Sequence, residues 1–473
     1  MTTYSLTLRE EDLERLRAHL LRPDGNEHAA YLLCTEARIA VDPWDREAHR
    51  KFHAYEVIPV SDDQVVESTP HLISWRTTSF VAALKRAQAG NQIVAIVHNH
   101  PAGMTEFSAQ DTSNERDLAE LAAKRNGPGT PIVSLILTAD NRLSARIWLH
   151  PSAKGHTPLR MIRVVGDAVR LHYSGRGGGQ PTAAFQRQAL AFGQALNEDL
   201  AVLRIGVVGC GGTGSAVAML LARLGVGQLA FIDNDIVDRT NLNRLHGARQ
   251  ADADAMAPKA VVVARTIAEL GLGVRVAPLV AWAGDPICRD TLRSCDLIFG
   301  CTDDNEGRLF LNRLAFFYLI PVIDIGLAID VSRAEPPEIK CLDGRVTVVT
   351  PPNRCLACRG VIDYRAAEQE SLRRRNPAEY ESRKAEAYVI GEGDPRPAVV
   401  TFTTEAATMA VNEMLHRLQG FRGPGGATAH RVRKFHLSQD FRPGPGQMEH
   451  CRLCDHRDSW GKGDVEPFLD RVE

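Results

Sequence analysis

A glycine-rich loop between a short apolar segment and a helical pattern constrains this 473-residue chain more than any other feature. The segment Arg204-Ile-Gly-Val-Val predicts a strand, and Gly209-Cys-Gly-Gly-Thr-Gly follows it directly. Glycines let the backbone approach a phosphate closely, and a helix N-terminus offers unpaired N–H groups and the positive end of a dipole. Strand and helix patterns then alternate to about residue 350, which predicts an α/β fold with a parallel, doubly wound sheet. The predicted nucleotide-binding glycines are Gly209, Gly211, Gly212 and Gly214.

Polar residues after the next strands indicate which nucleotide chemistry this loop serves. Asp233 ends the apolar run Leu229-Ala-Phe-Ile, at a position that suits binding of a ribose hydroxyl. Taken by themselves, the glycine loop and Asp233 would also fit a dinucleotide dehydrogenase. Hydride transfer, however, does not need the charged and amide groups that follow, which are Asp235, Asn241, Arg244, Lys259 and Asp303. Cations steady the charge of ATP phosphates and an acid holds Mg²⁺, so the set favours phosphoryl chemistry.

A histidine pair predicts a metal site in the first third of the chain. His98 and His100 follow the apolar run that begins at Ile93, and a strand places such alternate side chains on one face. Asp111, on a following helix, completes three ligands, and three protein ligands plus water are typical of catalytic zinc. Ser108 stands where that helix begins, which also suits an N-cap.

Two Cys-x-x-Cys pairs predict a second, structural metal site. They are Cys355-Leu-Ala-Cys358 and Cys451-Arg-Leu-Cys454, and four thiolates form the closed tetrahedral set of structural zinc. One such pair alone would also fit a redox motif, whereas two favour metal. The other six cysteines are interpreted as small buried apolar residues: Cys34, Cys210, Cys288, Cys295, Cys301 and Cys341.

Composition excludes several classes of function. Lys and Arg number 56 and Asp and Glu number 58, a net charge of −2, so no global basic field predicts nucleic-acid binding. No apolar run reaches the roughly 18 residues of a membrane span. The acidic, amphipathic N-terminus does not resemble a signal peptide. We therefore expect a cytoplasmic location, no membrane partner and no nucleic-acid partner.

A Gly- and Pro-rich segment divides the chain. Ser174-Gly-Arg-Gly-Gly-Gly-Gln-Pro-Thr182 predicts a linker at 173–183 between domains at 1–172 and 184–473. Within the second domain, residues 362–398 are charged and helical in pattern. We interpret them as a solvated helical insertion, with a functional lid as the alternative.

The spacing His-x-His-Pro, then Ser108, then Asp111 resembles that of the JAMM (MPN-plus, JAB-type) metallopeptidases. The resemblance implies an N-terminal α/β/α domain, a catalytic Zn²⁺, a serine that helps stabilise the oxyanion and a glutamate general acid/base on an earlier strand. Glu27 is the residue that we assign, with Glu36 and Glu56 as alternatives. The family's glycines after this glutamate are replaced here by Ala30 and Cys34.

Residues of roughly 184–455 resemble the ThiF-type, ubiquitin-activating-like adenylyltransferases. The resemblance rests on the glycine loop, the acidic strand end, Asn-Leu-Asn-Arg244, Lys259 and Cys-Thr-Asp303, although Leu245 follows Arg244 where the family usually has Gln. It implies that Asp233 binds ribose and that Asn241, Arg244 and Lys259 hold the phosphates. Asp303 would organise Mg²⁺ and the incoming carboxylate, and the four cysteines would hold structural zinc. Phe185-Gln-Arg187-Gln resembles the family's entry motif, which implies that Arg187 reaches a partner's ATP site in a homodimer.

Together these resemblances imply a bifunctional enzyme of a prokaryotic ubiquitin-like pathway. One domain would cut a peptide or isopeptide bond at the C-terminus of a ubiquitin-like or sulfur-carrier β-grasp protein, and the other would adenylate its C-terminal glycine. Residues 359–450 contain no cysteine, so we expect no thioester there and a separate conjugating protein; Cys210 and Cys341 are remote alternatives.

Four other interpretations stay open at this point. The chain could activate a sulfur carrier for cofactor or cysteine biosynthesis, or adenylate a peptide in natural-product synthesis. It could also be a binding scaffold with inactive sites, although the intact ligand and phosphate-binding sets argue against this. His-Asn-His-Pro also resembles a DNA-repair-associated branch, but no basic stripe supports a role on DNA.

Overall fold

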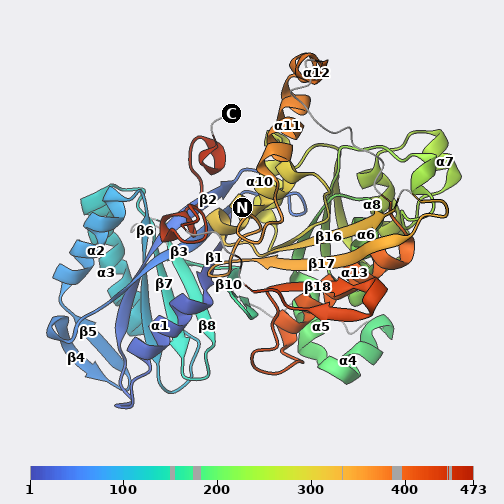
Figure 1. The fold of residues 1–473 in the computed structure, drawn as a ribbon. Helices are drawn as coiled ribbons and strands as arrows, with labels where there is room; N and C mark the ends of the chain where they lie inside the picture. Colours follow the sequence, from blue (N-terminus) through green and yellow to red (C-terminus); the bar gives the residue numbers. More distant parts are fainter. Residues whose placement is uncertain are drawn as a thin grey trace.

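The computed structural model describes residues 2–149, 155–173, 183–332, 334–385, 397–444, 446 and 450–471. Figure 1 shows two α/β domains side by side, the N-terminal one in blue to cyan and the C-terminal one in green to red. The predicted fold class is confirmed. Residues 174–182 of the predicted linker at 173–183 lie outside the described residues, so the domain boundaries stay a prediction. No helix in the described part of the chain is both long and apolar enough to cross a membrane.

The N-terminal domain is built on a nine-stranded sheet with the order β11-β10-β1-β3-β2-β6-β7-β8-β9. Its strands are β1 (Thr3–Arg9), β2 (Ala29–Ile39), β3 (His49–Pro59), β6 (Ile93–His100), β7 (Ile132–Thr138), β8 (Leu143–Trp148), β9 (Thr157–Pro158), β10 (Met161–Val165) and β11 (Val169–Tyr173). A separate hairpin consists of β4 (Val65–Thr69) and β5 (Leu72–Trp75). The helices are α1 (Glu10–Leu20), α2 (Thr77–Ala89) and α3 (Ala109–Asn126).

Strand alternation assigns these helices to opposite faces of the sheet. In β6, Ala95 and Val97 pack in one cluster with α1, whereas Val94 and Ile96 pack in another with α2 and α3. The domain is therefore an α/β/α sandwich, as expected. The histidines continue the second face, because His98 and His100 share the parity of Ile96.

The C-terminal domain contains an eight-stranded sheet with the order β14-β13-β12-β15-β16-β17-β18-β19. Its strands are β12 (Arg204–Val208), β13 (Gln228–Ile232), β14 (Arg275–Leu279), β15 (Leu297–Gly300), β16 (Val322–Val331), β17 (Ile339–Val349), β18 (His430–Lys434) and β19 (Gln439–Phe441). The helices are α4 (Gln186–Phe192), α5 (Gln194–Val202), α6 (Gly212–Leu224), α7 (Gln250–Asp254), α8 (Lys259–Glu269), α9 (Arg289–Ser294), α10 (Asn305–Tyr318), α11 (Tyr364–Arg375), α12 (Pro377–Ala385) and α13 (Val400–Gln419).

The sheet is parallel from β14 to β16 and antiparallel from β17 onward. Helices α6, α8 and α13 contribute to one core and helix α10 to the other, so the parallel part is doubly wound as predicted. The alternation to about residue 350 suggested that β17 would be parallel too. The connection from Val331 to Ile339 is too short for a crossover, so β17 returns beside β16 as a hairpin.

The second domain covers a polar face of the first. Many side chains of β1, β3 and β10 that face away from α1 are polar and nevertheless buried, among them Ser5, Thr7, His49, Lys51, His53 and Arg163. Arg163 donates to Asp296, and Lys51 Nζ donates to the carbonyl oxygens of Arg293 (2.7 Å) and Cys295 (2.9 Å). These contacts dock the first domain on the amino ends of β12 and β15.

The C-terminal segment also joins the two domains. After Cys454 the chain runs back to β2, where the Asp464 amide donates to the Glu36 carbonyl (2.9 Å) and Asp464 Oδ2 accepts from the Arg38 amide (2.7 Å). Gly463 has a φ of +70°, and a Cβ there would lie 2.5 Å from the Glu36 carbonyl oxygen. Only glycine therefore fits this contact without a shift of the backbone.

Candidate active sites

The ends of β6 and α3 form a cluster of metal-ligating side chains in the first domain. His98 Nε2 and His100 Nε2 lie 3.0 Å apart, and Asp111 oxygens lie 3.5 Å from His98 Nε2 and 3.7 Å from His100 Nε2. Both histidines are 5% exposed. His100 Nδ1 contacts the Met104 carbonyl oxygen (3.0 Å), and a proton on Nδ1 leaves the Nε2 lone pair free for a metal.

The donor set at this cluster fits zinc. One ligand atom from each of the three side chains lies within 4.8 Å of the other two, and two imidazoles with one carboxylate leave a fourth position open. Burial raises the pKa of Asp111, but hydrogen bonds from His100 and His98 outweigh burial and hold that pKa far below its usual range. The carboxylate is therefore ionised and ready to act as a ligand.

Glu27 is the predicted glutamate that lies beside the cluster. It is 6% exposed, immediately precedes β2, and interacts electrostatically with His98 and His100. Burial is the largest influence and raises the pKa of Glu27, although the two histidines oppose it. The alternatives lie in ion pairs elsewhere, Glu36 with Arg50 and Glu56 with Arg86.

Ser108 is exposed and caps α3, as its position in the sequence suggested. Its Oγ accepts from the Asp111 amide (3.0 Å), and its own amide donates to Asp111 Oδ2 (2.7 Å). This reciprocal cap holds the Asp111 carboxylate toward the histidines. Because Oγ acts as an acceptor in the cap, the hydroxyl hydrogen of Ser108 remains available for another acceptor.

The glycine loop of the second domain has the shape of a phosphate cradle. Gly209 has a φ of +88°, and a Cβ on Gly214 would lie 1.8 Å from the Gly209 carbonyl oxygen. A Cβ on Gly211 would meet nothing within 4 Å, so open space adjoins the loop there. The loop leads into the N-terminus of α6, where the cap residue Gly211 supplies no side-chain hydrogen bond and the first backbone N–H groups have no partner within the helix. These features fit the phosphates of a nucleotide.

The predicted polar residues gather around this loop. The Asp233 carboxylate accepts from the amides of Cys210 (2.6 Å) and Asp235 (2.7 Å); burial raises its pKa and these two bonds oppose the rise. Lys259 Nζ lies 2.8 Å from Asp235 Oδ2. Arg244 covers the loop, since a Cβ on Gly212 would lie 3.2 Å from Arg244 Cγ.

Asn241 follows β13 and Asp303 follows β15, the two strands that flank β12 in the sheet. Asn241 Oδ1 accepts from the Asp238 amide (3.1 Å) and thereby fixes the short turn that carries Arg244. Asp303 lies between β15 and α10, just beyond Cys301. The Cys301 backbone is so close to the glycine loop that a Cβ on Gly209 would lie 2.8 Å from it. The end of β15 therefore adjoins the glycine loop.

Arg187 is the predicted residue that this chain does not bring to its own loop. Arg187 lies on α4. Phe185, just before α4, packs against Gly225, where an added Cβ would lie 3.1 Å from the Phe185 ring. Gly225 follows the last residue of α6, whereas the glycine loop precedes the first. At about 1.5 Å per residue, the 13 residues of α6 separate these ends by about 20 Å.

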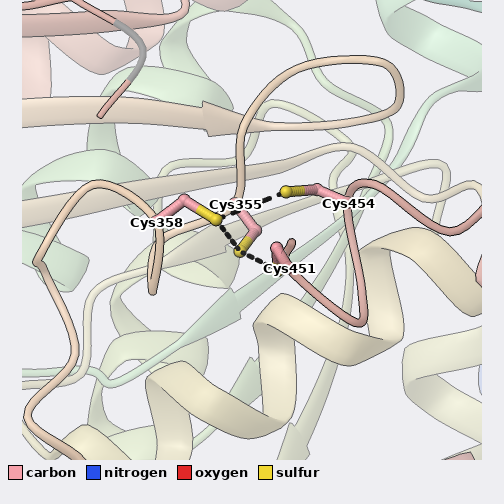
Figure 2. Close-up of side chains that lie close together, drawn as sticks. All are labelled: Cys355, Cys358, Cys451 and Cys454. Carbon is pink, nitrogen blue, oxygen red and sulfur yellow. Dashed lines mark hydrogen bonds between the residues drawn. The ribbon is translucent and has the colours of Figure 1, made fainter. Parts of the chain in front are cut away.

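The four predicted cysteines converge in the second domain (Figure 2). Sγ–Sγ distances are 3.6 Å for Cys355 and Cys358, 3.7 Å for Cys355 and Cys451, and 3.4 Å for Cys358 and Cys454. Zinc–sulfur bonds of about 2.3 Å would place tetrahedral sulfurs about 3.8 Å apart. The four thiols thus fit a structural zinc ion, and the predicted cysteine cluster is confirmed.

Sequence reasoning missed a buried charge cluster beside the nucleotide loop. Asp324, 1% exposed at the start of β16, pairs with Arg345 (2.5 Å) and Arg308 (3.5 Å). A Cβ on Gly300, at the end of β15, would lie 3.3 Å from Asp324 Oδ2. The one signal in the sequence was an acidic residue directly after the apolar run 314–323.

The charged insertion is anchored rather than simply solvated in its described part. Glu370 of α11 accepts from the Glu306 amide (2.8 Å), and Arg374 pairs with Glu306 (2.6 Å) and stacks on Trp282 (3.8 Å). These contacts dock α11 on the N-terminus of α10, next to Asp303. Residues 386–396 of the insertion lie outside the described residues.

Comparison with known families divides the chain in the same way. The model of the ThiF family matches residues 185–453, and the model of prokaryotic homologs of the JAB domain matches residues 9–149. The chain thus joins a JAB-type domain to a ThiF domain, as the resemblances implied.

Individual relatives each match about a third of this chain. The SAMP-activating enzyme E1 of Haloferax volcanii is 29% identical over 155 residues, which are 33% of this chain and 52% of that protein. The molybdopterin-synthase adenylyltransferase of Salmonella typhimurium is 32% identical over 167 residues, 34% of this chain and 61% of that protein. The chain therefore spans little more than half of these relatives. The structure of E. coli MccB with ATP covers 59% of this chain and 76% of its own, at 16% identity and a TM-score of 0.43.

Proposed function

The chain belongs to the ThiF family, and we propose that its second domain activates the C-terminal carboxylate of a ubiquitin-like or sulfur-carrier protein by adenylation with ATP. We further propose that the JAB-type domain cuts a peptide or isopeptide bond at the same kind of tail. The names of the relatives support the first part, since they include a SAMP-activating enzyme and a ThiS adenylyltransferase. The observation that carries it is the cradle of Gly209 to Gly214 with Arg244 and Lys259 beside it.

In the adenylation reaction a carboxylate oxygen bonds to the α-phosphorus of ATP, and pyrophosphate leaves. Asp233, at the end of β13, would bind the ribose. Arg244 and Lys259 would stabilise charge on the phosphates, and Asp303 would hold Mg²⁺ near the incoming carboxylate. Asn241 supports this set by fixing the turn before Arg244.

In the peptidase reaction His98, His100 and Asp111 would hold the catalytic zinc. Zinc in such a site lowers the pKa of a bound water toward neutrality and polarises the scissile carbonyl. Glu27 would take a proton from the attacking water and return it to the leaving amine. The free hydroxyl hydrogen of Ser108 would donate to the oxyanion. Four buried cysteines would hold a structural zinc in the other domain.

The remaining parts of the proposal concern assembly and partners. Arg187 lies far from this chain's own loop, which supports its use by a second copy in a homodimer. Burial raises the pKa of the Cys210, Cys295 and Cys301 thiols above their usual range. They are poor nucleophiles, and a separate conjugating protein would accept the activated tail.

A mass measurement tests both activities at once. A ubiquitin-like protein with residues beyond its C-terminal glycine would be incubated with the enzyme, ATP and Mg²⁺, with and without a zinc chelator. We expect loss of the C-terminal residues and then a gain of one AMP. With this substrate, Glu27→Gln should strongly reduce both changes, because adenylation needs the freed glycine carboxylate. On a ubiquitin-like protein that already ends in glycine, Glu27→Gln should leave adenylation intact. Arg244→Ala should abolish adenylation only. Adenylation of a short peptide in preference to the protein would favour natural-product synthesis, and an enzyme-linked thioester would contradict the separate conjugating protein.

A further inference from the structure

The residue between the two metal-ligating histidines has a side chain with two backbone partners. Asn99 is 1% exposed, and strand alternation directs it to the face opposite His98 and His100. Its Oδ1 accepts from the His28 amide (2.6 Å), and its Nδ2 donates to the Asn26 carbonyl oxygen (3.1 Å). The two partners lie on either side of Glu27 in the sequence. One side chain thus holds the backbone before and after the glutamate.

The register between β2 and β6 explains why this matters for the position of Glu27. Ala29 lies opposite His98 and the strands are antiparallel, so continuing this register brings His28 opposite Asn99 and Glu27 opposite His100. Ladder pairing is incomplete there, because β2 begins only at Ala29. Asn99 extends the pairing with His28 beyond the ladder in two ways: its side chain accepts from the His28 amide, and its backbone amide donates to the His28 carbonyl oxygen (3.3 Å). Glu27 is thereby kept on the metal-facing side of the sheet.

The β4–β5 hairpin holds the same short segment from its other side. The Glu27 amide donates to the Thr69 carbonyl oxygen (2.8 Å), and Ser68 Oγ donates to the Glu27 carbonyl oxygen (2.8 Å). Glu27 itself therefore has a fixed backbone, and Asn99 fixes the residues on both sides. The Glu27 carboxylate has no hydrogen bond of its own to orient it among those that the described residues form, so the backbone carries its position.

Only an amide side chain of this length meets both demands of the position. The His28 amide requires an acceptor and the Asn26 carbonyl requires a donor, which also fixes the orientation of the Asn99 amide. Aspartate would keep the acceptor but turn an oxygen toward the Asn26 carbonyl. Leucine has a similar size and offers neither group, so it would take these partners from the buried His28 amide and from the carbonyl group of half-buried Asn26.

We propose that Asn99 is a positioning residue for the peptidase reaction, which places Glu27 relative to His98, His100 and Asp111. This proposal rests on the proposed peptidase function. Asn99 touches neither the substrate nor the metal, and it acts through Glu27 alone. Since it stands in the same strand as two of the metal ligands, it ties the position of the base directly to that of the metal site.

The first experiment compares Asn99→Leu, Asn99→Asp and the control Asn126→Leu in the full-length protein. Asn126 is a matched control, because its Nδ2 also donates to a backbone carbonyl oxygen in the same domain, that of Leu84 (2.9 Å). For cleavage of the extended ubiquitin-like protein, we expect kcat to fall about 10- to 100-fold in Asn99→Leu. The fall should be smaller in Asn99→Asp and absent in the control. KM and zinc content should stay unchanged throughout.

A double substitution separates positioning from a general structural role. If Asn99 acts through Glu27, adding Asn99→Leu to Glu27→Gln should cause no further loss of kcat. The proposal would be overturned if Asn99→Leu lowered kcat in the Glu27→Gln background by the same factor as in the wild type. It would also be overturned if Asn99→Leu lost zinc while kcat per bound zinc stayed unchanged.

Hydrogen exchange decides the positional claim even if the protein shows no peptidase activity. Asn99→Leu should speed exchange in the segment 26–28 and leave the β2–β6 ladder from Ala29 onward protected, whereas Asn126→Leu should change neither. Unchanged exchange in Asn99→Leu would refute the role of Asn99. Absence of cleavage in the zinc-loaded wild type, with the expected exchange pattern, would instead refute only the proposed peptidase function.

Discussion

Replacement of Asp296 with Asn should weaken the docking of the two domains strongly. Asp296 is 3% exposed, accepts from Arg163 across the domain boundary, and accepts from the Arg204 amide (3.0 Å). Burial raises its pKa, but Arg163, Lys51 and Arg204 outweigh burial and keep the pKa below its usual range. The carboxylate is therefore ionised, and the substitution removes one negative charge that faces the buried guanidinium groups of Arg163 and Arg204. It also faces Lys51, whose pKa burial lowers to about 7.

The expected magnitude follows from what remains after the change. Removal of one partner of a buried ion pair costs about 3–5 kcal/mol, because the other charge stays buried without compensation. We expect a loss of that size in the free energy of unfolding for Asp296→Asn and for Arg163→Met. Removal of both charges should cost less than the sum of the single changes, with a coupling energy of about 2–3 kcal/mol.

The assay is urea unfolding followed by tryptophan fluorescence and by circular dichroism. Because the pair crosses the boundary, Asp296→Asn should also separate the unfolding of the two domains into two transitions. Arg239→Met is the control, since Arg239 pairs with Asp254 in an exposed bridge worth about 0–1 kcal/mol. The reasoning would be refuted if Asp296→Asn changed the free energy by less than the control did, or if the two single changes proved additive.

Three further predictions concern acid stability, nucleotide binding and metal. Burial, above all other influences, lowers the pKa of His53 to about 3, and neither ring nitrogen has a hydrogen-bond partner among the described residues. The unfolded chain binds a proton at this histidine below about pH 6.5, so its contribution to stability is complete above that pH and is lost as the pH falls toward 3. Between pH 6.5 and pH 3, His53 should lower the free energy of unfolding by up to ~1.4 kcal/mol for each pH unit, and His53→Leu should abolish this decrease. Urea unfolding at pH 7 and pH 5 measures the difference. Gly214→Ala should abolish ATP binding in calorimetry, because the new Cβ would lie 1.8 Å from the Gly209 carbonyl oxygen; retained affinity would contradict the cradle. Chelation should release two zinc ions per chain, and Cys454→Ser should leave only the ion at His98, as metal analysis would show.

Much of each site was predictable because its residues are close in sequence. His98 and His100 share a strand face through simple alternation, and Asp111 is brought to them by the cap that Ser108 forms. The glycine loop was predictable for a similar reason, since a strand, a turn and a helix follow one another without a long connection. The sequence alone left Glu36 and Glu56 as alternatives to Glu27 for the general base, because all three lie near predicted strands. Register between β2 and β6 favours Glu27.

Other features depended on contacts that no local pattern encodes. Asp324 and Arg345 meet only because β16 and β17 form a hairpin. The described part of the insertion was interpreted as solvated because its pattern is highly charged, yet Glu370 and Arg374 use their charges to dock α11 on α10. Charge in a helix thus does not distinguish a solvated face from one that is paired with another element.

The sequence by itself determined which residues form the two candidate sites and the cysteine cluster, and the tertiary structure decided how the parts of the protein are joined. Short motifs specify ligand sets and a phosphate cradle, because strand alternation and helix capping act over a few residues. The polar face that carries Lys51 and Arg163 looks solvent-exposed in the sequence, since it alternates with an apolar face. It is buried instead, because the second domain supplies Asp296 and backbone carbonyls as partners. Partners more than a hundred residues away can be identified only once the chain is folded.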